Sequence, residues 1–124
     1  MKLKKLFPIT ITSDLKECCD FYTKVFDFDI VFEAEWYIHL RHECGTELAV
    51  MLPDLDNQPK FLHAQYAGEG VVYSFEVDDA KKEYERIKEL EVEIIFNLKD
   101  EEWGQRHFMI KDPSGMIVDI VQQL

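Results

Sequence analysis

The sequence predicts an α+β fold of two βαβββ modules, an internal duplication within one domain of 124 residues. Apolar residues alternate or recur at helical spacing in the order β-α-β-β-β, and this order returns after a connector rich in proline and glycine. In addition, residues 24–32 match residues 88–96 in kind at eight of nine positions. We expect modules at about residues 1–54 and 69–124, with residues 55–68 as the connector.

The first module begins with a predicted strand over residues 3–12, where β-branched residues alternate with others. Ser13 or Asp14 can cap the helix that apolar spacing predicts over residues 14–26. Three further strands are predicted over residues 28–32, 36–41 and 47–52.

The second module repeats this order with a strand over residues 70–77 and a helix from Asp78 or Asp79 to about Leu90. A strand over residues 92–96 is followed by a predicted loop over residues 97–104. The last two strands are predicted over residues 105–111 and 116–121.

The segment Asp112-Pro113-Ser114-Gly115 is the strongest turn signal in the chain. Proline suits the first central position of a type I turn, and glycine suits the left-handed residue that closes a bulged hairpin. This geometry pairs Met109 with Asp119 and so sorts the side chains onto two faces. The uniformly apolar face, expected to meet the helix, carries Phe108, Ile110, Val118 and Ile120. The mixed face carries His107, Met109, Lys111, Asp119 and Val121.

The same register, moved back by 70 residues, assigns the faces of the first module. The helix face then carries Ile38, Leu40, Leu48 and Val50, and the mixed face carries Tyr37, His39, Arg41 and Ala49. We expect polar and aromatic groups of both modules to meet in one cavity, the usual place for a ligand.

Charge and cysteine content exclude several classes of partner. The chain has 25 acidic and 14 basic side chains, a formal net charge of −11, which disfavours nucleic acid and anionic membranes and favours a cationic ligand. Acidic cytosolic proteins are common, however, and most such charge serves solubility. The adjacent Cys18 and Cys19 and the distant Cys44 form neither a disulfide framework nor a CxxC metal site. No apolar run approaches the roughly 20 residues of a membrane span, so we expect a cytoplasmic protein.

His107 and Asp119 are the candidate catalytic residues because a histidine beside a carboxylate can transfer protons. The other interpretation is a structural hydrogen bond. His39 corresponds to Met109 in the second module, and it is either a ligand contact or a surface histidine whose hydrogen bonds are satisfied.

Aromatic and polar side chains of the mixed faces are the candidate ligand-binding residues. Trp36, Tyr37 and Trp103 can stack on planar or cationic ligands, although core packing explains them as well. Ser74 and Glu76 share the alternation of their strand with Val72, and Glu76 is either a lining acid or a solvated one.

The chain resembles the vicinal oxygen chelate superfamily of glyoxalases, bleomycin resistance proteins and extradiol dioxygenases. Asp14-Leu15 with Phe21-Tyr22-Thr23-Lys24-Val25-Phe26 resembles the family's first-helix pattern. Trp103-Gly104-Gln105-Arg106-His107-Phe108, followed by Asp112-Pro113-Ser114-Gly115 and Asp119, resembles its C-terminal hairpin. The resemblance implies a curved mixed sheet around a cavity, commonly in a homodimer.

Enzymes of this family usually hold a divalent metal with one histidine or glutamate from each of four strands. The resemblance places Phe7, Ala49 (or Met51), Val72 and Asp119 at those positions. Phenylalanine and valine offer no lone pair, so we expect no metal and no other cofactor. The same register turns Phe7 toward the cavity and Thr10 and Thr12 toward the helix, against simple apolar patterning.

These observations favour a metal-free protein that binds a small molecule, one that sequesters a cationic or aromatic compound as drug resistance proteins of the family do. The alternative is a lyase or isomerase in which His107 and Asp119 act as acid and base. Whether the chain is an enzyme stays open at this point. A fold kept only for dimer contacts is the weakest of the interpretations.

Overall fold

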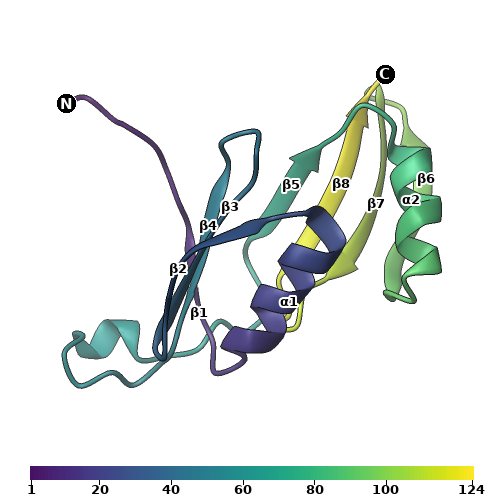
Figure 1. Cartoon of the computed structure of the whole chain (residues 1–124). Coiled ribbons are helices and arrows are strands. Elements are labelled where there is room, and N and C mark those ends of the chain that lie inside the picture. The colour runs from purple at the N-terminus through teal and green to yellow at the C-terminus, as the bar shows by residue number, and fades with distance from the viewer. The chain divides into compact units, whose positions relative to one another are not determined.

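The computed structural model describes all residues from 1 to 124. The chain divides into two compact units, unit 1 over Met1–Ala67 and unit 2 over Gly68–Leu124 (Figure 1). Each unit contains the order β-α-β-β-β, which confirms the predicted α+β class with two βαβββ modules.

Unit 1 contains one mixed sheet in the order β1-β4-β3-β2. Its elements are β1 (Ile9–Ile11), α1 (Leu15–Phe26), β2 (Asp29–Ala34), β3 (Tyr37–Arg41), β4 (Glu47–Met51) and the short 3-10 helix η1 (Lys60–Leu62). β1 runs parallel to β4, and the other neighbours are antiparallel.

Unit 2 repeats this topology in a second sheet with the order β5-β8-β7-β6. Its elements are β5 (Val72–Glu76), α2 (Ala80–Glu89), β6 (Ile94–Glu101), β7 (Gln105–Lys111) and β8 (Ile117–Gln123). β5 is parallel to β8 and takes the place that β1 has in unit 1.

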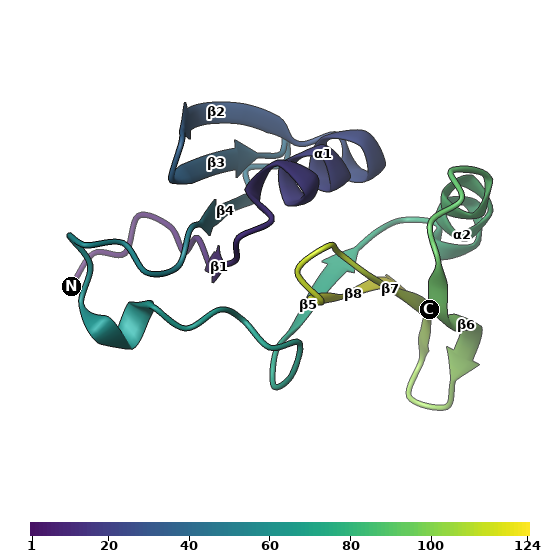
Figure 2. The same ribbon diagram turned by 90° about the horizontal axis from the view of Figure 1, so that it is seen from below.

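In each unit the helix packs on one face of the sheet (Figure 2). Asp79 caps α2, since its side chain accepts a hydrogen bond from the Lys82 amide at 3.1 Å. The side chains predicted to meet the helices are buried in both units: Ile38, Leu40, Leu48, Val50, Phe108, Ile110, Val118 and Ile120. Neither helix is long and apolar enough to cross a membrane.

We call the opposite face of each sheet the open face. In unit 1 it carries Tyr37, His39, Arg41, Glu47, Ala49 and Met51. In unit 2 it carries Gln105, His107, Met109, Lys111, Ile117, Asp119, Val121 and Gln123. The predicted pairing of Met109 with Asp119 is confirmed, and with it the predicted division of faces.

The unusual orientation expected for the first strand is also confirmed. Thr10 and Thr12 are buried, whereas Ile9 is largely exposed. Phe7 contacts the open-face residue His39, with ring centroids 4.9 Å apart. The apolar side chains of this segment therefore face away from the helix, as the register requires.

Two predicted boundaries are wrong. The strand expected over residues 3–12 is regular only over Ile9–Ile11, because Pro8 has no N–H with which to continue a ladder. Most of the loop expected over residues 97–104 belongs to β6, where Lys99 pairs with His107 and Glu101 with Gln105. Charged side chains hid this edge strand, a composition that edge strands commonly have.

Candidate functional site

The candidate catalytic pair lies on the open face of unit 2. His107 is the register partner of Val121, so Asp119 is its diagonal neighbour on β8. The Nδ1 atom of His107 lies 2.8 Å from Oδ1 of Asp119, and both residues are buried. The side chains that the sequence placed on one face are therefore in direct contact.

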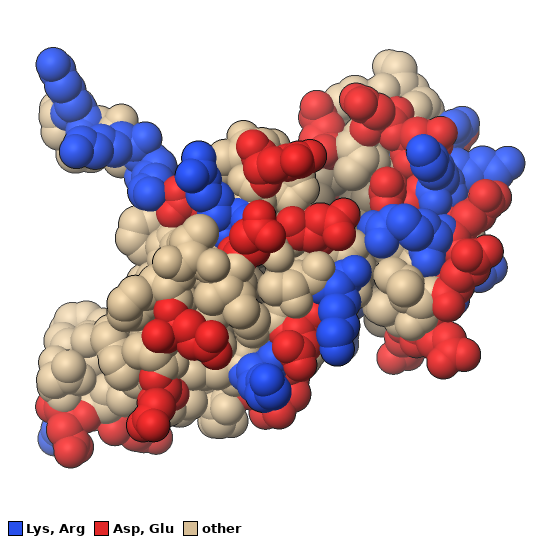
Figure 3. Space-filling model, viewed as in Figure 1, with Lys and Arg blue, Asp and Glu red and all other residues tan.

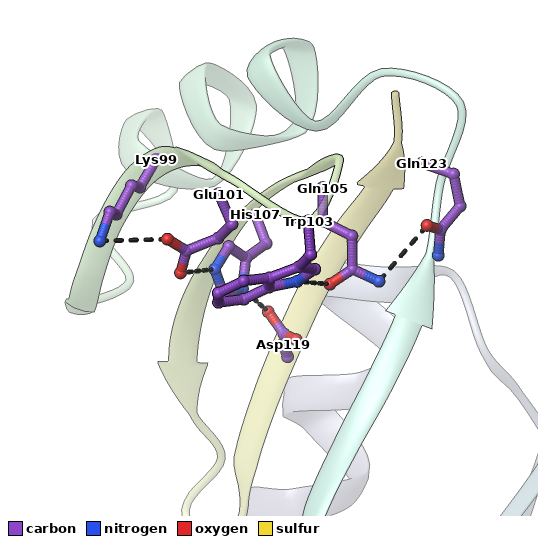
Figure 4. A network of polar contacts seen from close by, with 7 residues as sticks. All are labelled: Lys99, Glu101, Trp103, Gln105, His107, Asp119 and Gln123. Carbon is purple, nitrogen blue, oxygen red and sulfur yellow. Dashed lines mark hydrogen bonds and ion pairs between the residues drawn. The ribbon is translucent and has the colours of Figure 1, made fainter.

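A second carboxylate, which the sequence analysis missed, meets the other side of the same imidazole. Oε2 of Glu101 lies 3.0 Å from Nε2 of His107, and its Oε1 lies 3.1 Å from Nζ of Lys99. Figure 4 shows the ring held between Glu101 and Asp119. Alternation along β6 would have found Glu101 if residues 97–101 had been recognised as a strand.

This geometry sets the protonation state of the ring. A carboxylate accepts hydrogen bonds, so each ring nitrogen must carry a proton to donate to its partner, and the ring is an imidazolium. Burial alone would lower the pKa of His107, but its hydrogen bonds to Glu101 and Asp119 outweigh burial and raise that pKa. Hydrogen bonds from His107 and Lys99 hold the pKa of Glu101 below its usual value.

The chemistry open to this triad is limited. A general base needs a free lone pair within reach of its substrate, and both nitrogens of His107 are already engaged. The two carboxylates lie at opposite nitrogens of the ring, so they do not converge on one point. Indeed, no group of three or more His, Cys, Asp or Glu side chains in the structure is arranged to hold a metal ion.

A second series of hydrogen bonds lies on the same face and runs toward β5 (Figure 4). Nε1 of Trp103 donates to Gln105 at 2.9 Å, and Gln105 donates to Gln123 at 3.3 Å. Gln123 in turn donates to Oε1 of Glu76 at 3.0 Å. Glu76 is thus an exposed member of this series, and the indole of Trp103 is 68% exposed.

The remaining candidates of unit 2 lie around Asp119. Ser74 on β5 and Met109 on β7 are its register partners on either side. Val72, two residues before Ser74, is 50% exposed and has only methyl groups to offer. These side chains surround the buried pair with a surface that is partly polar and partly apolar.

The open face of unit 1 carries a separate polar chain. Oη of Tyr37 lies 2.7 Å from Nδ1 of His39, and Nε2 of His39 lies 2.7 Å from Oε1 of Glu47. Nζ of Lys5 contacts both oxygens of Glu47 at 2.9 and 2.8 Å. Both ring nitrogens of His39 therefore have a hydrogen-bond partner. Alternation from Ala49 would have placed Glu47 beside it, but the sequence analysis did not consider Glu47.

Aromatic side chains adjoin this chain. The ring centroid of Trp36 lies 5.3 Å from that of Tyr37, and that of Phe32 lies 6.1 Å from it. Phe7 contacts the ring of His39 edge-on. The register partner of His39, Ala49, has only a methyl side chain. Trp36 is 39% exposed and Phe7 is 37% exposed, so both present apolar surface to solvent.

The donor atoms at the four metal positions implied by the resemblance do not fit a metal. Phe7, Ala49 and Val72 carry no lone pair, and a thioether at Met51 is a soft ligand that hard divalent ions avoid. Only Asp119 could ligate a metal, and it is engaged with His107. The residues of this chain therefore do not form the family's metal centre.

Comparison with protein families gives one match, which covers nearly the whole chain. The model of the Glyoxalase/Bleomycin resistance protein/Dioxygenase superfamily matches residues 7–120. No curated protein matches.

Solved structures share the fold at low sequence identity. A glyoxalase/bleomycin resistance protein/dioxygenase from Nocardioides has a TM-score of 0.82 at 18% identity, covering 100% of this chain and 86% of that one. A lactoylglutathione lyase from Agrobacterium tumefaciens has a TM-score of 0.76 at 18% identity, covering 98% and 95%. TioX from Micromonospora sp. ML1 has a TM-score of 0.71 at 17% identity, covering 98% and 99%.

Proposed function

Because the chain belongs to the Glyoxalase/Bleomycin resistance protein/Dioxygenase superfamily, we propose that it is a metal-free member that binds a small organic molecule. The ligand would lie against the open face of a unit and be sequestered rather than transformed. We further propose that this ligand is cationic or aromatic, and that the protein acts as a cytoplasmic homodimer.

The donor chemistry of the open faces carries this proposal. Three of the four metal positions hold Phe7, Ala49 and Val72, which cannot ligate a metal but can contact an apolar ligand. The titratable groups beside them are paired with one another in both units. Such faces offer shape, apolar surface and a few fixed polar atoms, as small-molecule binding sites do.

The surface chemistry supports a cationic, aromatic ligand. Trp36 and Trp103 present exposed indoles, which can stack on planar rings and attract cations. The formal net charge of −11 favours a positively charged ligand at long range. Figure 3 shows acidic side chains interspersed with basic ones on the face in view, and basic side chains along the N-terminal segment.

The alternative, a lyase or isomerase using His107 and Asp119, receives no support from the geometry. Proton abstraction by His107 would first require loss of its hydrogen bond to Glu101 or Asp119 and then loss of a ring proton. Each step opposes the contacts that stabilise the imidazolium. The same contacts suit a structural role.

Thermal unfolding in the presence of 1-naphthylmethylammonium tests the proposal, with 1-naphthylmethanol as the uncharged control on the same ring. Binding at 100 times the dissociation constant should stabilise the protein by about 2.7 kcal/mol, and the cation should stabilise it more than the alcohol. Trp103→Ala, at a 68% exposed position, should weaken the effect without unfolding the chain if that indole stacks on the ligand.

Two results would contradict the proposal. The first is the absence of stabilisation by either naphthyl compound and by a wider panel of aromatic cations. The second concerns the metal: elemental analysis of the purified protein should show no stoichiometric divalent metal. A stoichiometric metal that is lost in Asp119→Ala would overturn the metal-free assignment.

A further inference from the structure

The polar chain on the open face of unit 1 differs from the triad of unit 2 in one respect. The second ring nitrogen of His39 contacts the hydroxyl of Tyr37, whereas that of His107 contacts a second carboxylate. It runs from Lys5 through Glu47 and His39 to Tyr37, with every contact between 2.7 and 2.9 Å. Glu47 is buried and Tyr37 is half-buried, so the open end of the chain is the hydroxyl of Tyr37.

The direction of each hydrogen bond follows from the buried end. Lys5 holds both oxygens of Glu47, and the hydrogen bonds from Lys5 and then from His39 keep the pKa of Glu47 below its usual value. Glu47 is therefore an ionised acceptor at neutral pH. The Nε2 atom of His39, 2.7 Å away, must donate its proton to the carboxylate.

A neutral imidazole carries only one N–H, so the Nδ1 atom of His39 is left with a lone pair. When His39 is neutral, the phenolic proton is the only one available for its 2.7 Å contact with Tyr37, and Tyr37 donates it. The Tyr37 oxygen then has only lone pairs to offer a ligand. Burial and the charge of Glu47 raise the pKa of Tyr37, so the hydroxyl keeps its proton in mildly alkaline solution.

Apolar rings adjoin the rings of Tyr37 and His39. Trp36 and Phe32 lie next to Tyr37. Phe7 lies against His39, the hydrogen-bond partner of Tyr37. All three rings are more than a third exposed. A planar ligand resting on such rings would have its edge close to an oxygen that accepts hydrogen bonds and does not donate them.

We propose that the open face of unit 1 is a subsite for a planar aromatic ligand with an N–H donor, and that the Tyr37 oxygen, oriented by His39 and Glu47, is its obligate acceptor. This inference rests on the proposed function, because it specifies the ligand class of a binding protein. Tyr37 is the contact residue, and His39 and Glu47 are positioning residues.

Indole and benzofuran test this polarity, because they have almost the same size and shape while only indole has an N–H. We would titrate each into the 15N-labelled full chain at pH 8, above the usual range of imidazole titration, and follow the amide signals of residues 37–39. The wild-type chain should bind indole about 3- to 10-fold more tightly than benzofuran, the ratio expected for one net hydrogen bond.

Two variants separate the hydrogen bond from ring stacking. Tyr37→Phe keeps the ring and removes the oxygen, so both probes should still bind but with equal affinity. His39→Leu leaves the oxygen and removes its acceptor, so the released hydroxyl can donate to benzofuran and the preference should fall or reverse. The amide spectra of both variants report whether the chain is folded.

The outcomes distinguish this inference from the proposed function. Equal binding of the two probes by the wild type, or a preference that survives in Tyr37→Phe, would overturn the acceptor role while leaving a binding protein. Failure of indole to bind would also overturn the inference. If the naphthyl cations fail as well, the proposed function fails with it.

Discussion

His39 and His107 occupy the same kind of position in two hairpins but have different hydrogen-bond partners. Each lies diagonal to a carboxylate that comes two residues before its register partner, Glu47 in one unit and Asp119 in the other. The two sites differ at the second ring nitrogen, which meets a hydroxyl in unit 1 and another carboxylate, Glu101, in unit 2. Two carboxylates both accept from the ring of His107, whereas the hydroxyl of Tyr37 can donate to a ring nitrogen of His39.

Cys44 should be the reactive cysteine of the chain. It is exposed, and hydrogen bonds with the Thr46 side chain and backbone lower its pKa to about 7, whereas Cys18 and Cys19 are buried. We expect iodoacetamide to label Cys44 selectively in the folded protein, with a rate that rises with pH around a midpoint of about 7. Mass spectrometry of timed samples measures this rate.

Thr46→Val is the matched control for that experiment, because it removes the hydroxyl and keeps the branched side chain. The midpoint should move up toward the ordinary range of thiols. A wild-type midpoint near 9, or equal labelling of all three cysteines, would contradict the assignment.

At the scale of single residues, the sequence predicted side chains whose strands are marked by apolar alternation. His107 and Asp119 were placed together because the turn set the register of β7 and β8. Glu101 was missed because polar residues hide β6, and no pattern in one sequence reveals the hydrogen bond that orients Tyr37. Residue types and their spacing predict on which face of a sheet a side chain lies, but they do not predict which group its polar atoms contact.

The hairpin of β7 and β8 depends on the side chain of Asp112. Its Oδ1 accepts hydrogen bonds from the Ser114 amide at 2.8 Å, the Ser114 hydroxyl at 2.6 Å and the Met116 amide at 3.0 Å. Gly115 has φ +90°, the left-handed conformation that the sequence predicted for it. This turn sets the register that brings Asp119 to His107.

Asp112→Ala should therefore destabilise the protein by about 1–3 kcal/mol, because it leaves the buried Met116 amide without its acceptor. Asp112→Asn keeps an oxygen at Oδ1 and should recover most of the loss. Urea unfolding of the two variants and the wild type measures the difference. Equal stability of Asp112→Ala and the wild type would show that the turn forms without this side chain.

At the scale of elements, both helices and every strand were predicted to exist, and the errors lie at edges. β1 and β6 are edge strands, each with only one neighbour. An edge strand is not required to be apolar on both sides, and its length depends on its neighbour and on local breakers such as Pro8. Among the central strands, β3 alternates between buried and less buried residues, whereas β4 is buried throughout and β8 is buried over residues 118–121.

At the scale of the whole molecule, the pH dependence of stability follows from a few shifted groups. The pKa of His107 is raised, so its stabilising effect is complete below the unfolded value of about 6.5 and is lost as the pH rises through its folded pKa. The pKa values of Glu47 and Glu101 are lowered. Their stabilising effect is therefore present above the unfolded value of about 4.5 and is lost as the pH falls. The combined contribution of these three groups should therefore be greatest between about pH 4.5 and 6.5.

The alkaline side of this profile can be assigned to His107 by comparing two variants. Cys44 has a lowered pKa and would stabilise the fold with rising pH, so Cys44→Ser serves as the background that removes this opposing titration. In that background the free energy of unfolding, from urea curves at pH 6, 7 and 8, should fall by up to about 1.4 kcal/mol per pH unit, the limit for one proton. Adding His107→Gln should flatten the slope, because the amide does not titrate. Equal slopes in the two variants would mean that His107 is not an imidazolium held between Glu101 and Asp119.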